Sequence, residues 1–198
     1  MRLPFAVVVF LGSISGAHSQ ECLARFQEIL MDQSDKGAFK TLAEQEIKGG
    51  MKSKNYFYQA KSGHWMTEAI EPENMQWTLV HDDVMYSSSD KGATWQKVRE
   101  MDSAANQAAV NKSLTENAKT ARDTICIEET VDGVRYEKVS GTYDTVSGFK
   151  ATNSHVYWIN LDTGWLEKAY YEMSSESFSS KTTQTIEKLD FLELPMPE

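Results

Sequence analysis

The sequence predicts an α+β protein built on a long antiparallel meander with two helices, and three observations lead to that class. Residues 134–192 contain segments rich in Val, Ile, Thr, Tyr, Phe and Trp, separated by short polar turns, which is typical of strands joined by hairpins. Two other segments carry apolar residues at helical spacing. The 198 residues are enough for one domain, and no repeat has the period of a solenoid or propeller.

The elements are expected in a simple order along the chain. The first helix covers residues 21–33, where Cys22, Phe26 and Ile29 share one side, and a strand over 38–48 ends at a Gly-Gly break. Residues 51–101 form a strand-rich block, and the four strands of the meander end the chain. The remaining strands are expected at 55–61, 65–70, 75–80, 84–87, 94–98, 134–143, 148–161, 164–173 and 178–192.

A second helix is expected between the two strand blocks, over residues 102–121, with Asp102 or Ser103 as its N-cap. Its apolar side is dominated by alanine, so the helix can lie close to the sheet while burying little surface. Two interpretations are equally open at this point. The helix is either an easily displaced lid or a plain crossover connection.

The first 19 residues are expected to be a targeting signal. Arg2 is the charged start, residues 3–14 are the apolar core, and residues 17–19 are Ala-His-Ser, which offer small residues at the two positions that a cleavage site requires. The apolar core is shorter than the ~20 residues that a membrane-spanning helix needs. We therefore expect residues 20–198 to be a single exported domain, periplasmic or secreted, without stable membrane insertion.

The charge of the chain argues against two classes of partner. The formal net charge is −9, and without Arg2 it is one unit more negative. A surface this acidic repels phosphate backbones and anionic lipid headgroups, which disfavours binding to nucleic acid or to a membrane surface.

Two cysteines, Cys22 and Cys126, remain after removal of the signal. In an oxidising compartment an even number favours one disulfide, which would join the first helix to the sheet. A bridge that closes a loop of about 100 residues would stabilise the fold by up to about 4–5 kcal/mol. The alternative is two buried thiols that pack as small apolar side chains.

The segment Trp158-Ile-Asn-Leu-Asp-Thr-Gly-Trp-Leu166 resembles a hairpin of the periplasmic lipoprotein-carrier superfamily, the LolA/LolB-like half-barrels. Other features resemble that superfamily in the same order: the signal, the N-terminal helix and following strand, a loop at Pro72 before 75–80, a hairpin from Tyr86 to Trp95, the inserted helix, a hairpin at 131–134 and the late Pro195. The resemblance implies an unclosed antiparallel half-barrel whose concave face is covered by the two helices. It also implies a role in shielding the acyl chains of lipids or lipoproteins from water.

Aromatic and methionine side chains within strands are the candidates for a ligand groove. Each one taken alone is better explained as ordinary core, so the hypothesis depends on the set. The set is Trp77, Tyr86, Trp95, Tyr157, Trp158, Trp165, Tyr170 and Met173.

Three short motifs have both a structural and a functional interpretation. Residues 88–95 fit the Asp-box S-x-D-x-G-x-T-W of sialidase propellers, but one copy indicates only a stabilised hairpin. Asp162-Thr-Gly164 matches the aspartic-protease triplet, and a polar turn is the expected role. His81-Asp82-Asp83 offers metal ligands, yet adjacent turn residues seldom aim at one ion and no HxH, HExxH or CxxC motif accompanies them, so no metal site is expected.

These observations predict a non-enzymatic exported binding protein that carries or sequesters a lipid, an acyl chain or a lipoprotein. We expect a monomer without a cofactor. The alternative is an envelope protein–protein interaction module with a filled core and no small ligand. A small hydrolase is disfavoured because the sequence contains no G-x-S-x-G motif, no phosphate-binding loop and no evident nucleophile–base pair.

Overall fold

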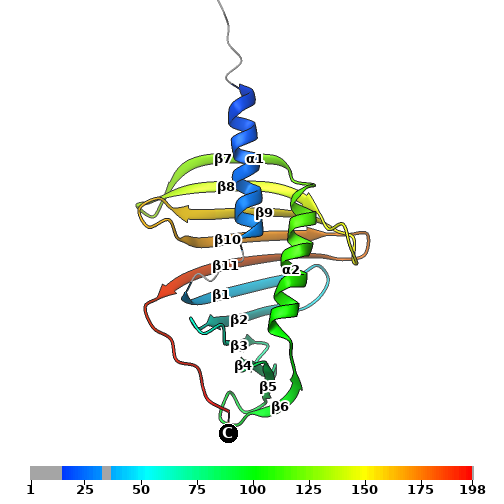
Figure 1. The fold of residues 1–198 in the computed structure, drawn as a ribbon, viewed down its shortest axis with the longest axis vertical. Helices are drawn as coiled ribbons and strands as arrows, with labels where there is room; N and C mark the ends of the chain where they lie inside the picture. The colour runs from blue at the N-terminus through cyan, green and yellow to red at the C-terminus, as the bar shows by residue number, and fades with distance from the viewer. Residues whose placement is uncertain (1–14, 33–36, 198) are drawn as a thin grey trace, which may run out of the picture.

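The computed structural model describes residues 15–32 and 37–197, which form one antiparallel sheet with two helices (Figure 1). Residues 1–14 of the expected signal lie outside the described part of the chain. The eleven strands lie in the order β6-β5-β4-β3-β2-β1-β11-β10-β9-β8-β7. Strands β6 and β7 are the two edges of this sheet and do not pair with each other. The predicted α+β class with an unclosed half-barrel sheet is confirmed.

Two meanders make the sheet, and they meet where β11 pairs with β1. The chain passes through helix α1 (Ser15–Met31), the first meander, helix α2 (Ser103–Ala118) and the second meander. The first meander contains β1 (Ala38–Ile47), β2 (Lys52–Gln59), β3 (Trp65–Glu71), β4 (Trp77–His81), β5 (Val84–Ser88) and β6 (Gln96–Glu100). The second contains β7 (Arg122–Val131), β8 (Val134–Asp144), β9 (Thr152–Asn160), β10 (Leu166–Ser174) and β11 (Ser179–Leu189).

The strands lie close to the positions expected from the sequence, with one addition. Strand β7 was expected only as part of the 131–134 hairpin that the resemblance implied. It is an edge strand whose residues are mostly exposed, so its sequence lacks the apolar run that marks an inner strand. Helix α1 begins at Ser15, inside the segment expected to be the signal.

Helix α1 packs on the second meander and forms the larger core of the protein. Phe26 has no exposed surface and clusters with Val139 of β8 and Tyr157 of β9. Gly141 of β8 permits this close approach, because a Cβ atom there would lie 2.9 Å from carbons of the Phe26 ring. Burial of such a side chain stabilises the fold by about 1.5–3 kcal/mol relative to an exposed one.

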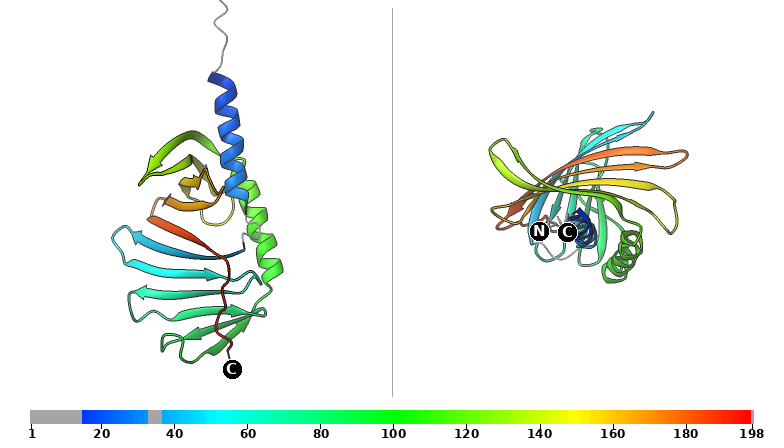
Figure 2. Two further views of the ribbon diagram at one scale, coloured as in Figure 1. Left: turned by 90° about the vertical axis from the view of Figure 1, so that its left-hand side faces the viewer. Right: turned by 90° about the horizontal axis from the view of Figure 1, so that it is seen from above.

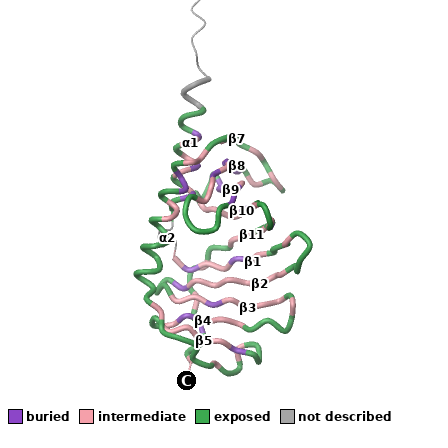
Figure 3. The backbone as a smooth tube through the Cα atoms, turned by 90° about the vertical axis from the view of Figure 1, so that its right-hand side faces the viewer, coloured by how far each residue is buried: buried purple, intermediate pink, exposed green. Residues whose placement is uncertain are grey.

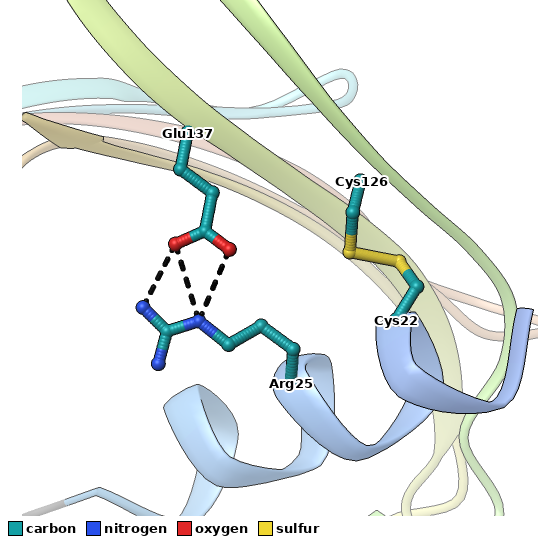
Figure 4. Close-up of a disulfide and its surroundings, with 4 residues drawn as sticks. All are labelled: Cys22, Arg25, Cys126 and Glu137. Atoms are coloured by element: carbon teal, nitrogen blue, oxygen red, sulfur yellow. Dashed lines mark hydrogen bonds and ion pairs between the residues drawn. A yellow bond between two sulfur atoms is a disulfide. The ribbon is translucent and has the colours of Figure 1, made fainter. Parts of the chain in front are cut away.

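A disulfide between Cys22 and Cys126 joins α1 to β7, as predicted (Figure 4). One turn further along α1, Arg25 lies between two carboxylates: its Nη2 is 2.8 Å from Glu137 Oε2, and its Nη1 is 2.9 Å from Glu28 Oε2. The hydrogen bonds to Glu137 raise the pKa of Arg25. A covalent bond, an ion pair and an apolar contact therefore all fix α1 to the second meander.

A smaller apolar cluster lies on the opposite face of the sheet, over the first meander. Leu79 of β4 has no exposed surface and packs with Met66, Ala60 and Leu194. Leu194 belongs to the C-terminal segment 190–197, which runs across the strands of the first meander (Figure 2). The two halves of the sheet are thus covered on opposite faces, one by a helix and one by the end of the chain.

Helix α2 contacts the rest of the protein at its two ends: the backbone N–H of Ser103, its first residue, donates to Asp83 Oδ1 at 3.3 Å, and its last turns pack on the larger core. Asp102 caps its start as expected, since its carboxylate accepts a hydrogen bond from the backbone N–H of Ala105 at 2.8 Å. Asn117 and Ala118 are buried, whereas residues 103–112 are all exposed (Figure 3). The expectation that the alanine-rich side lies close to the sheet therefore holds only for the last turns, where Leu114 and Ala118 pack with the larger core, and is wrong for the first half of the helix. No helix in the described ranges is long and apolar enough to cross a membrane.

Candidate ligand-binding cleft

A cleft of about 350 Å³ opens between α2 and the middle of the sheet, on the face that carries both helices. Its volume lies at the lower end of the range of ~300–1,000 Å³ typical of small-molecule sites. Strands β1, β2, β10 and β11 provide its floor, and Gln107 is the lining residue from α2. The lining residues are Asp32, Phe39, Thr41, Phe57, Gln59, Gln107, Trp165, Leu166, Tyr171, Gln184 and Ile186.

Four aromatic side chains form a continuous row along this face, which we call the aromatic row: Trp165, Phe39, Phe57 and Trp65. Their ring centroids are separated by 6.4 Å, 6.0 Å and 5.9 Å in that order. The row crosses the strands rather than following one of them, because its members come from the loop before β10 and from β1, β2 and β3. All four side chains are half-buried.

The alternation of side chains in β2 explains why the row faces the cleft. Phe57 lies between Tyr56 and Tyr58, and successive residues of a strand point to opposite faces. Tyr56 and Tyr58 both lie beside the ammonium group of Lys40, at 3.8 Å and 5.5 Å from their ring centroids. One face of β2 thus presents a polar aromatic cluster, and the other presents Phe57 to the cleft.

A buried histidine–tyrosine network adjoins the cleft through Tyr171. The Nδ1 of His155 is 2.7 Å from the hydroxyl of Tyr157, and its Nε2 is 3.2 Å from the hydroxyl of Tyr143. Burial lowers the pKa of His155 from its ordinary 6.5 to about 4. The ring is therefore neutral at pH 7, and both of its nitrogens are occupied by tyrosine hydroxyls, one as donor and one as acceptor.

Polar groups at one end of the row give the cleft an asymmetric character. The ammonium group of Lys188 lies 5.5 Å from the centroid of the Trp165 ring. The indole N–H of Trp165 is buried and has no hydrogen-bond acceptor among the described residues. An unsatisfied buried donor costs about 1–3 kcal/mol, so this end favours a ligand or water that supplies an acceptor.

The structure distributes the eight predicted groove residues over both faces of the sheet. Trp165 lines the cleft, while Tyr157 lies on the same face but is buried under α1, with its ring 6.0 Å from that of Phe26. Met173 of β10 is half-buried, two residues beyond Tyr171. The other five lie toward the opposite face: Trp77, Tyr86, Trp95, Trp158 and Tyr170.

The five opposite-face residues have partners within the protein. Tyr86 and Trp95 pack against the cluster around Leu79, the indole N–H of Trp158 donates to Glu129, and the Tyr170 hydroxyl donates to Glu172 at 3.0 Å. A ligand contact by any of the eight stays a prediction. Phe39, Phe57 and Trp65 were missed, because only the pairing register of β1, β2 and β3 shows that they meet.

The Asp-box occupies the hairpin between β5 and β6. The Asp90 carboxylate accepts hydrogen bonds from the hydroxyls of Ser88 at 2.7 Å and Thr94 at 2.6 Å, and from the Thr94 backbone N–H at 2.9 Å. These bonds lower the pKa of Asp90 to about 2. Gly92 has φ +86°, and the ring of Trp77 packs against it. The motif therefore has the hairpin-stabilising arrangement that was expected.

The Asp162-Thr-Gly triplet also lies in a turn, between β9 and β10. The backbone N–H groups of Asp162 and Thr163 donate to the side-chain oxygen of Asn160, at 2.8 Å and 3.3 Å, and Gly164 has φ +67°. A side chain that bonds the backbone two residues later is a common way to stabilise a turn.

No protein-family model and no curated protein matches the chain. Among solved structures, the chain is similar to a LolA superfamily protein from Nitrosomonas europaea. The identity is 13%, the TM-score is 0.33, and the match covers 89% of this chain and 94% of the other. A likeness at this level does not establish shared membership of a family, so the function is argued below from the cleft itself.

Proposed function

We propose that this chain is a non-enzymatic exported binding protein that holds an apolar chain, such as the acyl chain of a lipid or lipoprotein, along the aromatic row. Residues 20–198 would be the working domain after removal of a signal, and it would act as a monomer without a cofactor. The observation that carries the proposal is the row itself: four adjoining aromatic rings, of which Trp165, Phe39 and Phe57 line a cleft that the helices leave open.

The energetics suit an elongated apolar ligand. Each methylene group removed from water contributes about 0.8 kcal/mol, so a few methylenes over the rings offset a large part of the cost of ordering the ligand. A row that crosses the strands matches the shape of an extended chain better than that of a compact metabolite. The lower end of the volume range suits one such chain.

The rim of the cleft supports a polar head at one end. Lys188 lies beside Trp165, and its ammonium group is a suitable partner for a carboxylate or phosphate. Helix α2 lies across the cleft with Gln107 at the wall, and its exposed first half has few contacts to lose. This supports the lid interpretation over the plain crossover. The start of α2 is held by hydrogen bonds to Asp83 and its end by packing of the last turns, so the exposed half between them can move at low cost.

The state of His155 supports a binding role rather than catalysis. A general base must be able to reach a substrate proton, and this ring is buried with both nitrogens held by tyrosine hydroxyls. Its lowered pKa follows from burial, with no carboxylate among the causes. We therefore assign the network to the support of Tyr171 at the edge of the cleft.

A pair of neighbouring substitutions tests the proposal on the full chain. Binding of a fluorescent fatty acid should weaken about tenfold in Phe57→Ala, which corresponds to ~1.4 kcal/mol of lost contact. Tyr56→Ala is the matched control: it removes an adjacent half-buried ring from the same strand but on the opposite face. Its affinity should equal that of the natural protein, with both measured by fluorescence titration.

A second variant tests the cleft by filling it. Gln184 of β11 lines the floor, and Gln184→Trp adds bulk without removing a ring of the aromatic row. Bound fatty acid should decrease in this variant as well. Equal affinity in all four proteins, or no binding by the natural one, would refute the proposal. Native mass spectrometry of protein purified from its own envelope should show a lipid or acyl mass.

One observation favours a second candidate, an envelope protein–protein interaction module. Ile125 and Ile127 are 58% and 48% exposed on β7, an edge strand whose free side can pair with another strand. In that case, amide hydrogen exchange of β7 should slow in the presence of an envelope extract. The protection should disappear in Ile127→Lys, while fatty-acid binding should be absent in both proteins.

A further inference from the structure

Two histidines and an aspartate meet on the face of the sheet opposite the cleft. His64 immediately precedes β3, His81 is the last residue of β4, and Asp82 follows His81 in the turn to β5. The Nε2 of His64 is 3.0 Å from Asp82 Oδ1, and the Nδ1 of His81 is 3.3 Å from Asp82 Oδ2. The centroids of the two imidazole rings are 3.9 Å apart, and the ring planes are tilted by 35°.

The strand register explains this meeting. Trp65 pairs with Val80 in the β3–β4 ladder, so the residues just outside that pair, His64 and His81, lie opposite each other. Strand alternation places both on the face away from the aromatic row. Asp82 and Asp83 have φ values of 47° and 57°, as a two-residue turn of type I′ requires, and this turn returns the Asp82 carboxylate toward the histidines.

From this geometry we propose that His64, His81 and Asp82 form a binding site for one divalent transition-metal ion of the zinc class. One ligand atom from each of the three residues lies within 4.8 Å of the others. In a tetrahedral zinc site with bonds of about 2.0–2.2 Å, ligand atoms lie roughly 3.3 Å apart. The two nitrogen–oxygen separations, 3.0 Å to Oδ1 and 3.3 Å to Oδ2 of Asp82, are close to that spacing, so a small movement of the carboxylate would bring one oxygen into place.

The chemistry of the ligands selects the ion. Two imidazole nitrogens and one carboxylate oxygen suit Zn²⁺, Ni²⁺ or Cu²⁺, whereas Mg²⁺ and Ca²⁺ prefer all-oxygen sites. The histidine side chains are 26% and 15% exposed, so they are partly fixed by their surroundings while an ion can still reach them. The net charge of −9 favours the approach of a cation.

The C-terminal segment forms the other wall of this site. His64 and His81 line a cavity of about 260 Å³ together with Phe191, Leu192 and Glu193. Glu193 is the residue of that wall with a carboxylate, so it or a water molecule would supply the fourth ligand. A bound ion would then connect the β2–β3 turn, the β4–β5 turn and the end of the chain, and this role is independent of the cleft.

Metal titration of the full chain, purified without an affinity tag and stripped with a chelator, tests the site. Calorimetry with Zn²⁺ should show one equivalent bound, and His64→Gln and His81→Gln should each weaken binding by at least about tenfold. Cu²⁺ bound to the natural protein should show nitrogen coupling in its electron paramagnetic resonance spectrum. This coupling should disappear in the double variant.

Asp83→Asn is the matched control, because Asp83 is the neighbouring turn residue and asparagine tolerates the same positive φ. It should bind Zn²⁺ as the natural protein does, whereas Asp82→Asn should bind it more weakly. Circular dichroism of the metal-free variants separates loss of ligands from loss of folding. Absence of stoichiometric binding by the natural protein, or unchanged binding in a folded double variant, would overturn the proposal.

Discussion

The two halves of the helix-bearing face differ in what covers them, and the difference separates a packed core from an open cleft. Over β8 and β9, Phe26 fills the space completely, and a disulfide and an ion pair hold α1 in place. Over β1 and β2, the rings of Phe39 and Phe57 are only half-buried, and α2 stands off with its first half exposed. The same sheet therefore has a filled core at one end and an open floor at the other.

The largest contrast is expected between two phenylalanines on this one face. Phe26→Ala should lower the free energy of unfolding by about 3–5 kcal/mol, because it leaves a cavity in a packed core. Phe39→Ala should lower it by about 1 kcal/mol, since its ring is already partly solvated in the cleft. Urea denaturation of the two variants measures both values. Equal losses would show that the cleft half is packed as tightly as the core.

Removal of the disulfide sharpens the comparison by releasing α1 alone. The double variant Cys22→Ser/Cys126→Ser should lose about 2–5 kcal/mol, because the unfolded chain is no longer constrained over a separation of 104 residues. Hydrogen exchange should accelerate in α1 and β8 before it does in β1 and β2. Uniform acceleration along the whole sheet would contradict the division into two halves.

Acid should destabilise the filled half through His155. The pKa of this ring falls from 6.5 to about 4 on burial, so below pH 6.5 the unfolded chain binds the proton more readily than the folded chain. Stability should therefore decrease as the pH falls from 6.5 to 4, by about 2–3 kcal/mol, and level off below that. Denaturation midpoints of the natural protein and of His155→Gln should diverge in this window, with the variant less sensitive.

The smallest expected effect tests the close approach of α1 to β8. In Gly141→Ala the new Cβ atom would lie 2.9 Å from carbons of the Phe26 ring, so the helix must shift. We expect a loss of about 1–3 kcal/mol. Ser140→Ala, on the same strand, is the matched control. Gly148→Ala is unsuitable as a control, because the φ of +72° at Gly148 would strain any residue with a side chain. A neutral effect of Gly141→Ala would mean that α1 is free to move at this point.

Local patterns were sufficient to predict most of the strands, both helices and the disulfide. The polar turns marked the hairpins, and the spacing of Cys22, Phe26 and Ile29 marked the buried side of α1. Strand β7 was largely missed because most of its residues are exposed, so its sequence has little of the apolar pattern that marks a buried strand. The alanine pattern of α2 suggested a helix close to the sheet. A sequence pattern does not show whether any other part of the protein lies near enough to pack against the helix.

The candidate sites depended on contacts across strands that no local pattern contains. Of the eight residues proposed for the groove, Trp165 is the one that lines the cleft. The next two rings of the row, Phe39 and Phe57, are 18 positions apart in the sequence but lie in paired strands. His64 is likewise separated from His81 by the whole of β3, the following loop and the rest of β4. Whether a ring faces a cleft or a core is set by register, which a shift of one residue would reverse.

The sequence by itself determined the class of this protein and the order of its elements, because these follow from residue type and spacing along the chain, and it favoured a bridge between Cys22 and Cys126 from their even number in an exported chain. The tertiary structure alone decided which face each ring occupies, where α2 leaves the sheet uncovered and that His64 meets His81. The physical reason is that alternation and pairing register act between strands, and the packing that fixes them involves residues far apart in the sequence.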